Sequence, residues 1–299
     1  MQTVTDLFAK EDFASLDKMA DELWRTHARM PDGLWKLSLF YGAMNVAPDQ
    51  GGTNNWDDYF ARIGRWEKHF PASATARIVH ARALTSYAWD ARGTGSADTV
   101  TAQGKQLFAE RLAQARAVLD SDPALRAWPG YYQMMIELAL DQGWARAEYE
   151  RLFAAAAQLA PDYETFYFLE AKWHGAVGIG WHHFALNIAK ATEAQYGQAF
   201  YARIVWAAIA ATPSNLPTFQ ASLVDWPRMR TGFHDLARQY PNSLWNENAF
   251  CFYAWAARDR PTARQLFDDL KGRYAPDIWQ SAENFQLAEA WAQSEKPAL

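Results

Sequence analysis

A histidine-rich segment holds the residue types most typical of metal chemistry. His174 follows Glu170 by four residues, so on a helix the two side chains share a face, as metal ligands often do. His182 and His183 stand further on, but adjacent residues on a helix point about 100° apart and cannot both join one site. We interpret the segment as a polar turn with surface histidines, with a metal site as the alternative. We therefore predict no bound metal.

Three glycines in the same segment, Gly175, Gly178 and Gly180, could be mistaken for a phosphate-binding loop. Such a loop needs a strand before it, whereas a helical pattern precedes these glycines. We interpret the segment as a turn between helices and predict no nucleotide or other cofactor.

A second group of candidates ends a predicted helix. Trp89, Asp90 and Arg92 precede Gly93 and Gly95, which supply a helix C-cap and a turn. Arg92 can pair with Asp90 or reach the last carbonyl groups of the helix. We favour a capped turn packed by Trp89, and the rim of a ligand site is the functional alternative.

Two asparagines, Asn246 and Asn248, open the first helix of a late helical pair. In helical repeats the first helices line the concave face, where asparagines commonly hold a peptide backbone or a carboxylate. Tyr201 and Arg203 share an earlier helix that could line the same concavity. These four residues are candidate ligand contacts, and polar helix faces without a ligand are the alternative.

No group of residues indicates nucleophilic or acid–base catalysis. Cys251 lies in an apolar stretch, where a small buried hydrophobic residue is its ordinary role. There is no Gly-x-Ser-x-Gly motif, and the paired acids at 57–58 and 268–269 are adjacent, so they diverge on a helix. We name no catalytic residue and favour a protein without enzymatic activity.

The composition excludes several classes of partner. The chain has 29 basic and 34 acidic residues and no basic run, which does not favour binding to nucleic acid or to an anionic membrane. A single cysteine excludes an internal disulfide, and no apolar run is long enough to span a bilayer. The N-terminus does not resemble a signal peptide, although removal of a leader would leave the same sequence. These features predict a cytoplasmic protein.

The elements that position the candidates are marked by a repeated proline. A helical stretch ends, a proline and a polar or small residue follow, and another aromatic-rich helical stretch begins; the clearest copies are Phe70–Ser73, Ala160–Tyr163 and Tyr240–Ser243. Proline cannot continue a helix but suits the first turn of the next one. A mark that recurs every roughly 35–50 residues, or at twice that, predicts stacked helical hairpins.

The predicted fold is all-α, a right-handed α-solenoid of antiparallel hairpins with about 13–14 helices. Phe153, Ala156 and Pro161, and later Ala263 and Phe267, match the tetratricopeptide pattern in part. We predict one continuous domain over 1–299, with a softer N-terminal part in 1–55 that includes an irregular connection at 45–55.

Several blocks resemble a known family, the bacterial domain of unknown function numbered 4034. They cover nearly the whole chain and comprise Tyr87–Gly95, Asp32–Leu37, Lys172–Gly175 with Trp181, Tyr201–Trp206, and the segments from Asp225 through Asn246 to Arg264. The resemblance implies a bacterial, all-helical, repeat-like protein with no assigned activity, and it identifies no catalytic residue.

Three hypotheses for function follow. The first is a non-catalytic interaction module that holds a peptide or a partner protein on an extended concave surface. The second is an enzyme, or a small-molecule or glycan binder, with a Trp-lined cleft near Trp89, Trp173 and Trp181. The third is a structural subunit that associates with further copies of itself. We favour the first, because the repeats and the 15 tryptophans are not accompanied by a catalytic cluster.

Overall fold

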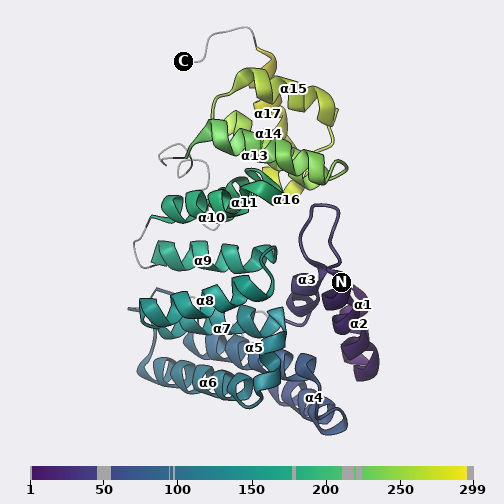
Figure 1. The fold of residues 1–299 in the computed structure, drawn as a ribbon, viewed down its shortest axis with the longest axis vertical. Coiled ribbons are helices and arrows are strands. Elements are labelled where there is room, and N and C mark those ends of the chain that lie inside the picture. Colours follow the sequence, from purple (N-terminus) through teal and green to yellow (C-terminus); the bar gives the residue numbers. More distant parts are fainter. Residues whose placement is uncertain are drawn as a thin grey trace. The chain divides into compact units, whose positions relative to one another are not determined.

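The structure is a computed structural model that describes residues 2–45, 55–93, 95–96, 98–176, 180–210, 219 and 224–294. Within these ranges the chain is helical and contains no β-strand, which confirms the all-α prediction (Figure 1). Most of the predicted connection at 45–55 and Gly178 lie outside the described residues.

The described residues divide into two compact units. Unit 1 comprises Met1–Ala28 and Trp35–Leu169, and unit 2 comprises Arg29–Leu34 and Glu170–Leu299. The helices of unit 1 are α1 (Gln2–Ala9), α2 (Phe13–Thr26), α3 (Lys36–Ala43), α4 (Trp56–His69), α5 (Ala74–Arg92), α6 (Ala102–Asp120), the 3₁₀ helix η1 (Pro123–Ala127), α7 (Pro129–Gln142) and α8 (Arg146–Leu159). The prediction of one continuous domain stays a prediction.

Helix α9 (Glu164–Ala176) begins in unit 1 and ends in unit 2. The remaining helices of unit 2 are α10 (Trp181–Tyr196), α11 (Ala199–Ala210), α13 (Trp226–Gln239), α14 (Leu244–Ala256), α15 (Arg260–Leu270), α16 (Pro276–Trp279) and α17 (Ala282–Gln293). The described ranges thus hold sixteen α-helices, more than the 13–14 predicted. Helix α1 was not predicted. The sequence predicts a single closing helix over Pro276–Trp291, but the structure divides this stretch in two at Gln280, whose φ is 65°.

The three proline marks form one repeated turn. The caps Phe70, Ala160 and Tyr240 have φ/ψ values of −128°/68°, −143°/81° and −133°/67°. Each cap donates its N–H to the carbonyl four residues earlier, at 2.8, 3.0 and 2.8 Å, and accepts from the N–H three residues later, at 2.9, 3.1 and 3.3 Å. The same local sequence therefore ends a helix and begins the next in the same way at three places.

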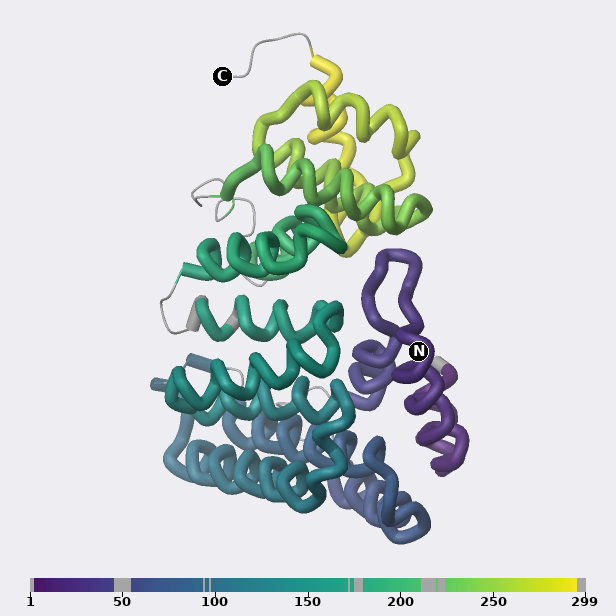
Figure 2. The backbone as a smooth tube through the Cα atoms, viewed as in Figure 1, coloured from purple at the N-terminus to yellow at the C-terminus, as the bar shows by residue number. Residues whose placement is uncertain are grey.

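Helices that follow one another in sequence pack against each other within each unit (Figure 2). In unit 1, α4, α5, α6, α7 and α8 form such a series; in unit 2, α10, α11, α13, α14 and α15 do, and α17 packs on α15. Gly232 of α13 permits one close approach, because a Cβ there would clash with the Gln198 carbonyl oxygen and lie 2.8 Å from the Ala202 Cβ at the start of α11.

Candidate functional site

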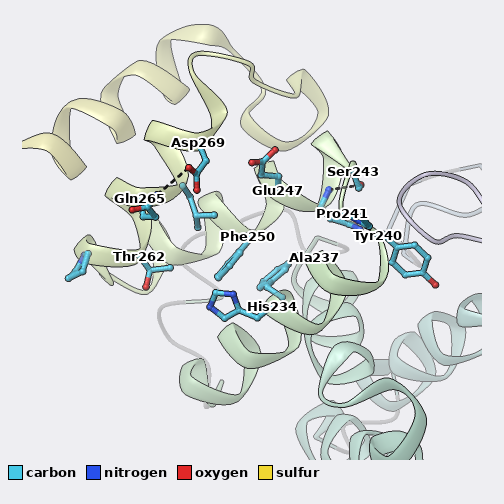
Figure 3. Close-up of a pocket in the computed structure, with 14 residues that line it drawn as sticks. His234, Ala237, Tyr240, Pro241, Ser243, Glu247, Phe250, Thr262, Gln265 and Asp269 are labelled. Atoms are coloured by element: carbon cyan, nitrogen blue, oxygen red, sulfur yellow. Dashed lines mark hydrogen bonds between the residues drawn. The ribbon is translucent and has the colours of Figure 1, made fainter.

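A cavity of about 520 Å³ lies between α13, α14 and α15 in unit 2 (Figure 3). Its volume is within the roughly 300–1,000 Å³ that is usual for ligand pockets. The lining residues are Phe233, His234, Ala237, Tyr240, Pro241, Ser243, Asn246, Glu247, Phe250, Pro261, Thr262, Gln265, Leu266 and Asp269.

Two capped helix starts position these side chains. Ser243 accepts the N–H of Asn246 at 3.1 Å, which fixes the start of α14 directly after the proline turn. Asp259 caps α15 through the N–H of Thr262, at 3.3 Å. The same carboxylate accepts the indole N–H of Trp226, at 3.0 Å, so the start of α13 is bonded to the start of α15. Two walls of the cavity, α13 and α15, are therefore linked at their N-termini.

Phe250 borders the apolar part of the cavity but is itself only 4% exposed. Its ring stacks on Phe233, with centroids 5.0 Å apart and planes 11° apart, and meets the His234 ring edge-on at 5.0 Å. Figure 3 shows Phe250 between the α15 side chains and those of His234 and Ala237. Partial burial, together with the nearby Arg230 and Arg238, lowers the pKa of His234.

Two carboxylates, those of Glu247 and Asp269, stand at one end of the cavity (Figure 3). Asp269 accepts a hydrogen bond from Gln265 at 3.1 Å. The Arg273 guanidinium lies 3.8 Å from the Glu247 carboxylate, but its side chain is 59% exposed, so water screens this pair. Among the residues that the structure describes, no lysine or arginine lines the cavity, so the charged groups of its lining are acidic.

Asn246 lines the cavity and is only 4% exposed. Its side-chain amide donates to the Asp32 carbonyl oxygen at 3.0 Å. Its amide oxygen is buried and has no hydrogen-bond partner among the described residues. A buried acceptor without a partner is costly to the fold, and this oxygen has almost no accessible surface through which a ligand could contact it.

The Asp32 carbonyl belongs to Arg29–Leu34, the early segment that is part of unit 2. This segment is a tight turn: Met30 donates its N–H to the Leu34 carbonyl at 2.8 Å, and the Arg29 guanidinium donates to the Gly33 carbonyl at 2.7 Å. The Arg203 guanidinium also donates to the Asp32 carbonyl. A Cβ at Gly33 would clash with the Tyr240 ring.

The sequence candidates Arg203 and Asn246 are thus brought together, and together they hold a peptide carbonyl of the chain itself. Tyr201 is buried, and its hydroxyl accepts the Asp225 N–H at 3.0 Å, next to the start of α13. None of this requires a ligand. Of the four candidates from this group, only Asn246 lines the cavity.

Asn248 has a structural role. It is fully buried, and its amide donates to the Leu244 and Arg273 carbonyls at 2.9 and 3.1 Å. Its oxygen accepts the Ala275 N–H at 3.1 Å and the Trp279 indole N–H at 2.9 Å. With four hydrogen bonds made inside the protein, the side chain has no remaining group for the ligand contact we predicted.

The predicted helix end at Trp89 lies in unit 1 and is held by its own contacts. The Trp89 indole donates to Asp141 at 3.0 Å, and Asp90 accepts the Trp56 indole N–H at 2.5 Å. The Arg92 guanidinium lies 4.9 Å from the Trp89 ring and donates to the Gly93 carbonyl at 3.0 Å. These contacts agree with the capped turn that we favoured.

The histidine-rich candidates belong to unit 2. Trp173 is buried, and His174 Nε2 lies 3.2 Å from the Glu170 carboxylate, as their spacing predicts. Trp181 stacks on His182 with centroids 3.7 Å apart, and burial and His183 lower the pKa of His182. Among the described residues, no three histidine, cysteine or acidic side chains come together as metal ligands would.

The predicted Trp-lined cleft is not assembled within either unit. Trp89 belongs to unit 1, whereas Trp173 and Trp181 belong to unit 2, and none of the three lines the cavity at α13–α15. Cys251 is buried, and burial raises the pKa of its thiol, in agreement with its predicted role as a small core residue.

A corresponding groove in unit 1 provides an internal comparison. It lies beside the Phe70–Ser73 turn, between α4, α5 and α6, and has a volume of about 450 Å³. Arg77, four residues after the cap serine as Glu247 is in unit 2, pairs with Asp122 at 2.5 Å. His80, which corresponds to Phe250, pairs with Glu67 at 2.9 Å. The charges of this groove are paired inside the chain, whereas the cavity of unit 2 has an acidic surplus.

Most lining residues of the cavity were missed by the sequence analysis. The signal that was available is the spacing of Thr262, Gln265, Leu266 and Asp269, which places them on one face of α15. That face is partly polar, and a solvated helix face has the same pattern. This face of α15 becomes a wall of the cavity only because α13 and α14 lie beside it.

No family model matches the chain, and neither the curated proteins nor the solved structures include a match to it. The resemblance to family 4034 therefore stays a prediction. None of the described helices combines the length and apolar character that a membrane crossing requires.

Proposed function

We propose that unit 2 is a protein-interaction module that binds a segment of a partner polypeptide in the cavity between α13, α14 and α15. The observation that carries the proposal is the lining of the cavity, which combines accessible apolar residues such as Ala237, Pro241 and Leu266 with two carboxylates at one end, Glu247 and Asp269. A polypeptide supplies both complements, an apolar side chain for the apolar wall and N–H donors for the carboxylates.

The neighbouring Arg29–Leu34 turn supports this proposal. Arg203 and Asn246 already hold a backbone carbonyl at Asp32, so side chains of α11 and α14 are arranged to bind main-chain groups. The absence of a catalytic constellation among the lining residues also favours binding over chemistry. The lining includes the Thr262 hydroxyl, which donates to the Asp259 carboxylate at 2.8 Å, but this is part of the cap of α15, and the lowered pKa of Asp259 makes its carboxylate a poor base.

The finer expectations about fold and setting are part of the same proposal. We propose that the hairpins form a right-handed, tetratricopeptide-like solenoid and that the chain belongs to bacterial family 4034 and acts in the cytoplasm. The repeated turn at Phe70, Ala160 and Tyr240 supports the solenoid. Association with further copies of the chain remains an alternative that light scattering would test.

The test is selection of binding heptapeptides from a random phage-displayed library on the intact protein. Ala237 is exposed on α13 and lines the cavity, so Ala237→Trp fills the cavity without altering the core. Thr231 is exposed on the same helix and does not line the cavity, so Thr231→Trp is the matched control. We expect Ala237→Trp to weaken the selected peptides about tenfold or more, which corresponds to about 1.4 kcal/mol, and Thr231→Trp to leave their affinity unchanged.

The proposal is refuted if no heptapeptide is enriched, or if the enriched peptides bind the Ala237→Trp variant as tightly as the parent protein. Thermal midpoints of both variants, measured by circular dichroism, establish that each is folded.

A further inference from the structure

We infer that helix α17 binds the same helix of a second copy of the chain, as an antiparallel pair. This inference is separate from the proposed function, because α17 does not line the cavity at α13–α15. It starts from Leu287 of α17, which is 64% exposed. The other large hydrophobic side chains exposed in the described ranges reach 36–37%; they are Phe70, Leu186 and Leu244.

Helix α17 has one buried face and one open face. It packs on α15 and α16, and this packing buries Phe285, Ala288 and Ala292. The open face carries Glu283, Leu287 and Trp291, which are spaced four residues apart and are exposed, exposed and half-buried. A helix that ends a packed series closes it with a polar outer face, so an apolar centre on this face indicates that another surface covers it.

The C-terminal end of the open face is positively charged. The guanidinium carbons of Arg258 and Arg260 lie 5.6 and 4.9 Å from the centre of the Trp291 ring. Arg264 donates to the Ala292 carbonyl at 3.0 Å, at the last turn of α17. Arg258 is exposed, and the described residues give it no carboxylate partner. Its charge is therefore available to an acidic group from outside the chain.

The N-terminal end of the same face is negatively charged. Glu283 is exposed in the first turn of α17, and no cation of the described part of the chain pairs with it. Glu283 and Trp291 stand four residues before and after Leu287, so at 1.5 Å per residue each lies about 6 Å from it along the helix. The acidic end and the cationic end are thus equally far from the apolar centre.

This pattern is complementary to itself. A two-fold axis at Leu287 runs two copies of α17 antiparallel and places their leucines against each other. It also brings Glu283 of each copy to the level of Trp291 and Arg258 of the other, where opposite charges meet twice. The antiparallel arrangement sets the two helix dipoles favourably as well. Equal spacing about Leu287 is what a second copy requires, and it is the reason that we infer a second copy.

The first test is sedimentation equilibrium of the whole chain over a series of concentrations. We expect the apparent mass to rise from 34.0 kDa toward twice that value. Leu287→Asp should weaken association about a hundredfold or more, because each dimer loses the buried leucine twice. Gln286→Asp is the matched control, since Gln286 is exposed on α17 and points about 100° away from Leu287. It should leave the association constant nearly unchanged.

Two charge reversals test the pairing of Glu283 with Arg258. Glu283→Arg and Arg258→Glu should each weaken association about tenfold or more, because each dimer then contains two contacts between like charges. An equimolar mixture of the two variants should associate again, since every such contact in the mixed pair joins opposite charges. Both changes are at exposed side chains, so thermal midpoints by circular dichroism should show both variants folded.

Three results would overturn the inference. The first is a parent protein that stays at 34.0 kDa throughout the series. The second is an equal effect of Leu287→Asp and Gln286→Asp. The third is a mixture of the charge variants that associates no better than either variant alone. None of these results bears on peptide binding in the cavity, which the Ala237→Trp variant tests without a change in α17.

Discussion

Replacement of Asn248 by alanine should destabilise the protein more than replacement of any other asparagine discussed above. The side chain joins α14 to the segment that leads into α16, through the Ala275 N–H and the Trp279 indole N–H. It also bonds the Arg273 carbonyl. Asn248→Ala removes all of these partners at a position that is completely buried, where water cannot replace them.

The magnitude follows from the groups left without partners. A buried donor or acceptor that loses its hydrogen bond costs about 1–3 kcal/mol. Asn248→Ala leaves two such donors, and the Arg273 carbonyl is only partly buried, so we expect a loss of about 3 kcal/mol. A loss of 1 kcal/mol lowers the melting temperature by about 2–4 °C in a domain of this size, so the midpoint should fall by roughly 6–12 °C.

The assay is thermal unfolding followed by circular dichroism, with two comparison variants. Asn242→Ala alters an exposed asparagine of the proline turn and should change the midpoint by about 1 °C or less. Asn246→Ala loses one hydrogen bond, to Asp32, and removes an oxygen that has no partner, so its effect should lie between the other two. If Asn248→Ala has the same thermal midpoint as Asn242→Ala, the structural role assigned to the four hydrogen bonds of Asn248 is wrong.

Two further predictions concern packing and pH. Gly232→Ala should destabilise the protein by about 1–3 kcal/mol, because the added methyl group meets the backbone carbonyl of Gln198. Gly64→Ala, on an open helix face, should instead stabilise it by about 0.5–1 kcal/mol. Urea unfolding measures the free energy of both variants, and equal effects would contradict the argument. Burial alone would raise the pKa of Asp259. Hydrogen bonds from Trp226 and Arg230, among others, lower it by more than burial raises it, so the net pKa is below its usual 3.8. A lowered pKa stabilises the fold above the unfolded value, so the stability advantage of the parent over Asp259→Asn should be complete at pH 7 and shrink as the pH falls below about 3.8; an advantage that does not change between pH 7 and 3 would contradict it.

The local turns were predictable from the sequence because their information is local. A proline, a capping serine and an aromatic cap residue specify the same dihedral angles wherever they occur, as Phe70 and Tyr240 show. The division of the last helix was missed for the opposite reason. Gln280 adopts a positive φ that its residue type does not favour, directly after Trp279, which is buried in the core.

The candidate site was predictable only in part. Asn246 was identified because asparagines at the start of a repeat helix are informative, but its partner Asp32 is 214 residues away in sequence. Asn248 has the same residue type and almost the same position, yet it faces the interior. Two residues apart on a helix, the side chains point to different sides, and the sequence does not say which side a neighbouring segment covers.

The Arg29–Leu34 turn has a consequence for the order in which the protein is built. During synthesis Asp32 is made 171 residues before Arg203 and 214 residues before Asn246, so its carbonyl cannot form these hydrogen bonds until both partners have been synthesised. Contacts of such long sequence separation form late, after the entropy of a large closed loop has been lost. A polypeptide that begins at Glu170 would never acquire this turn, and its Arg203 guanidinium would stand against water.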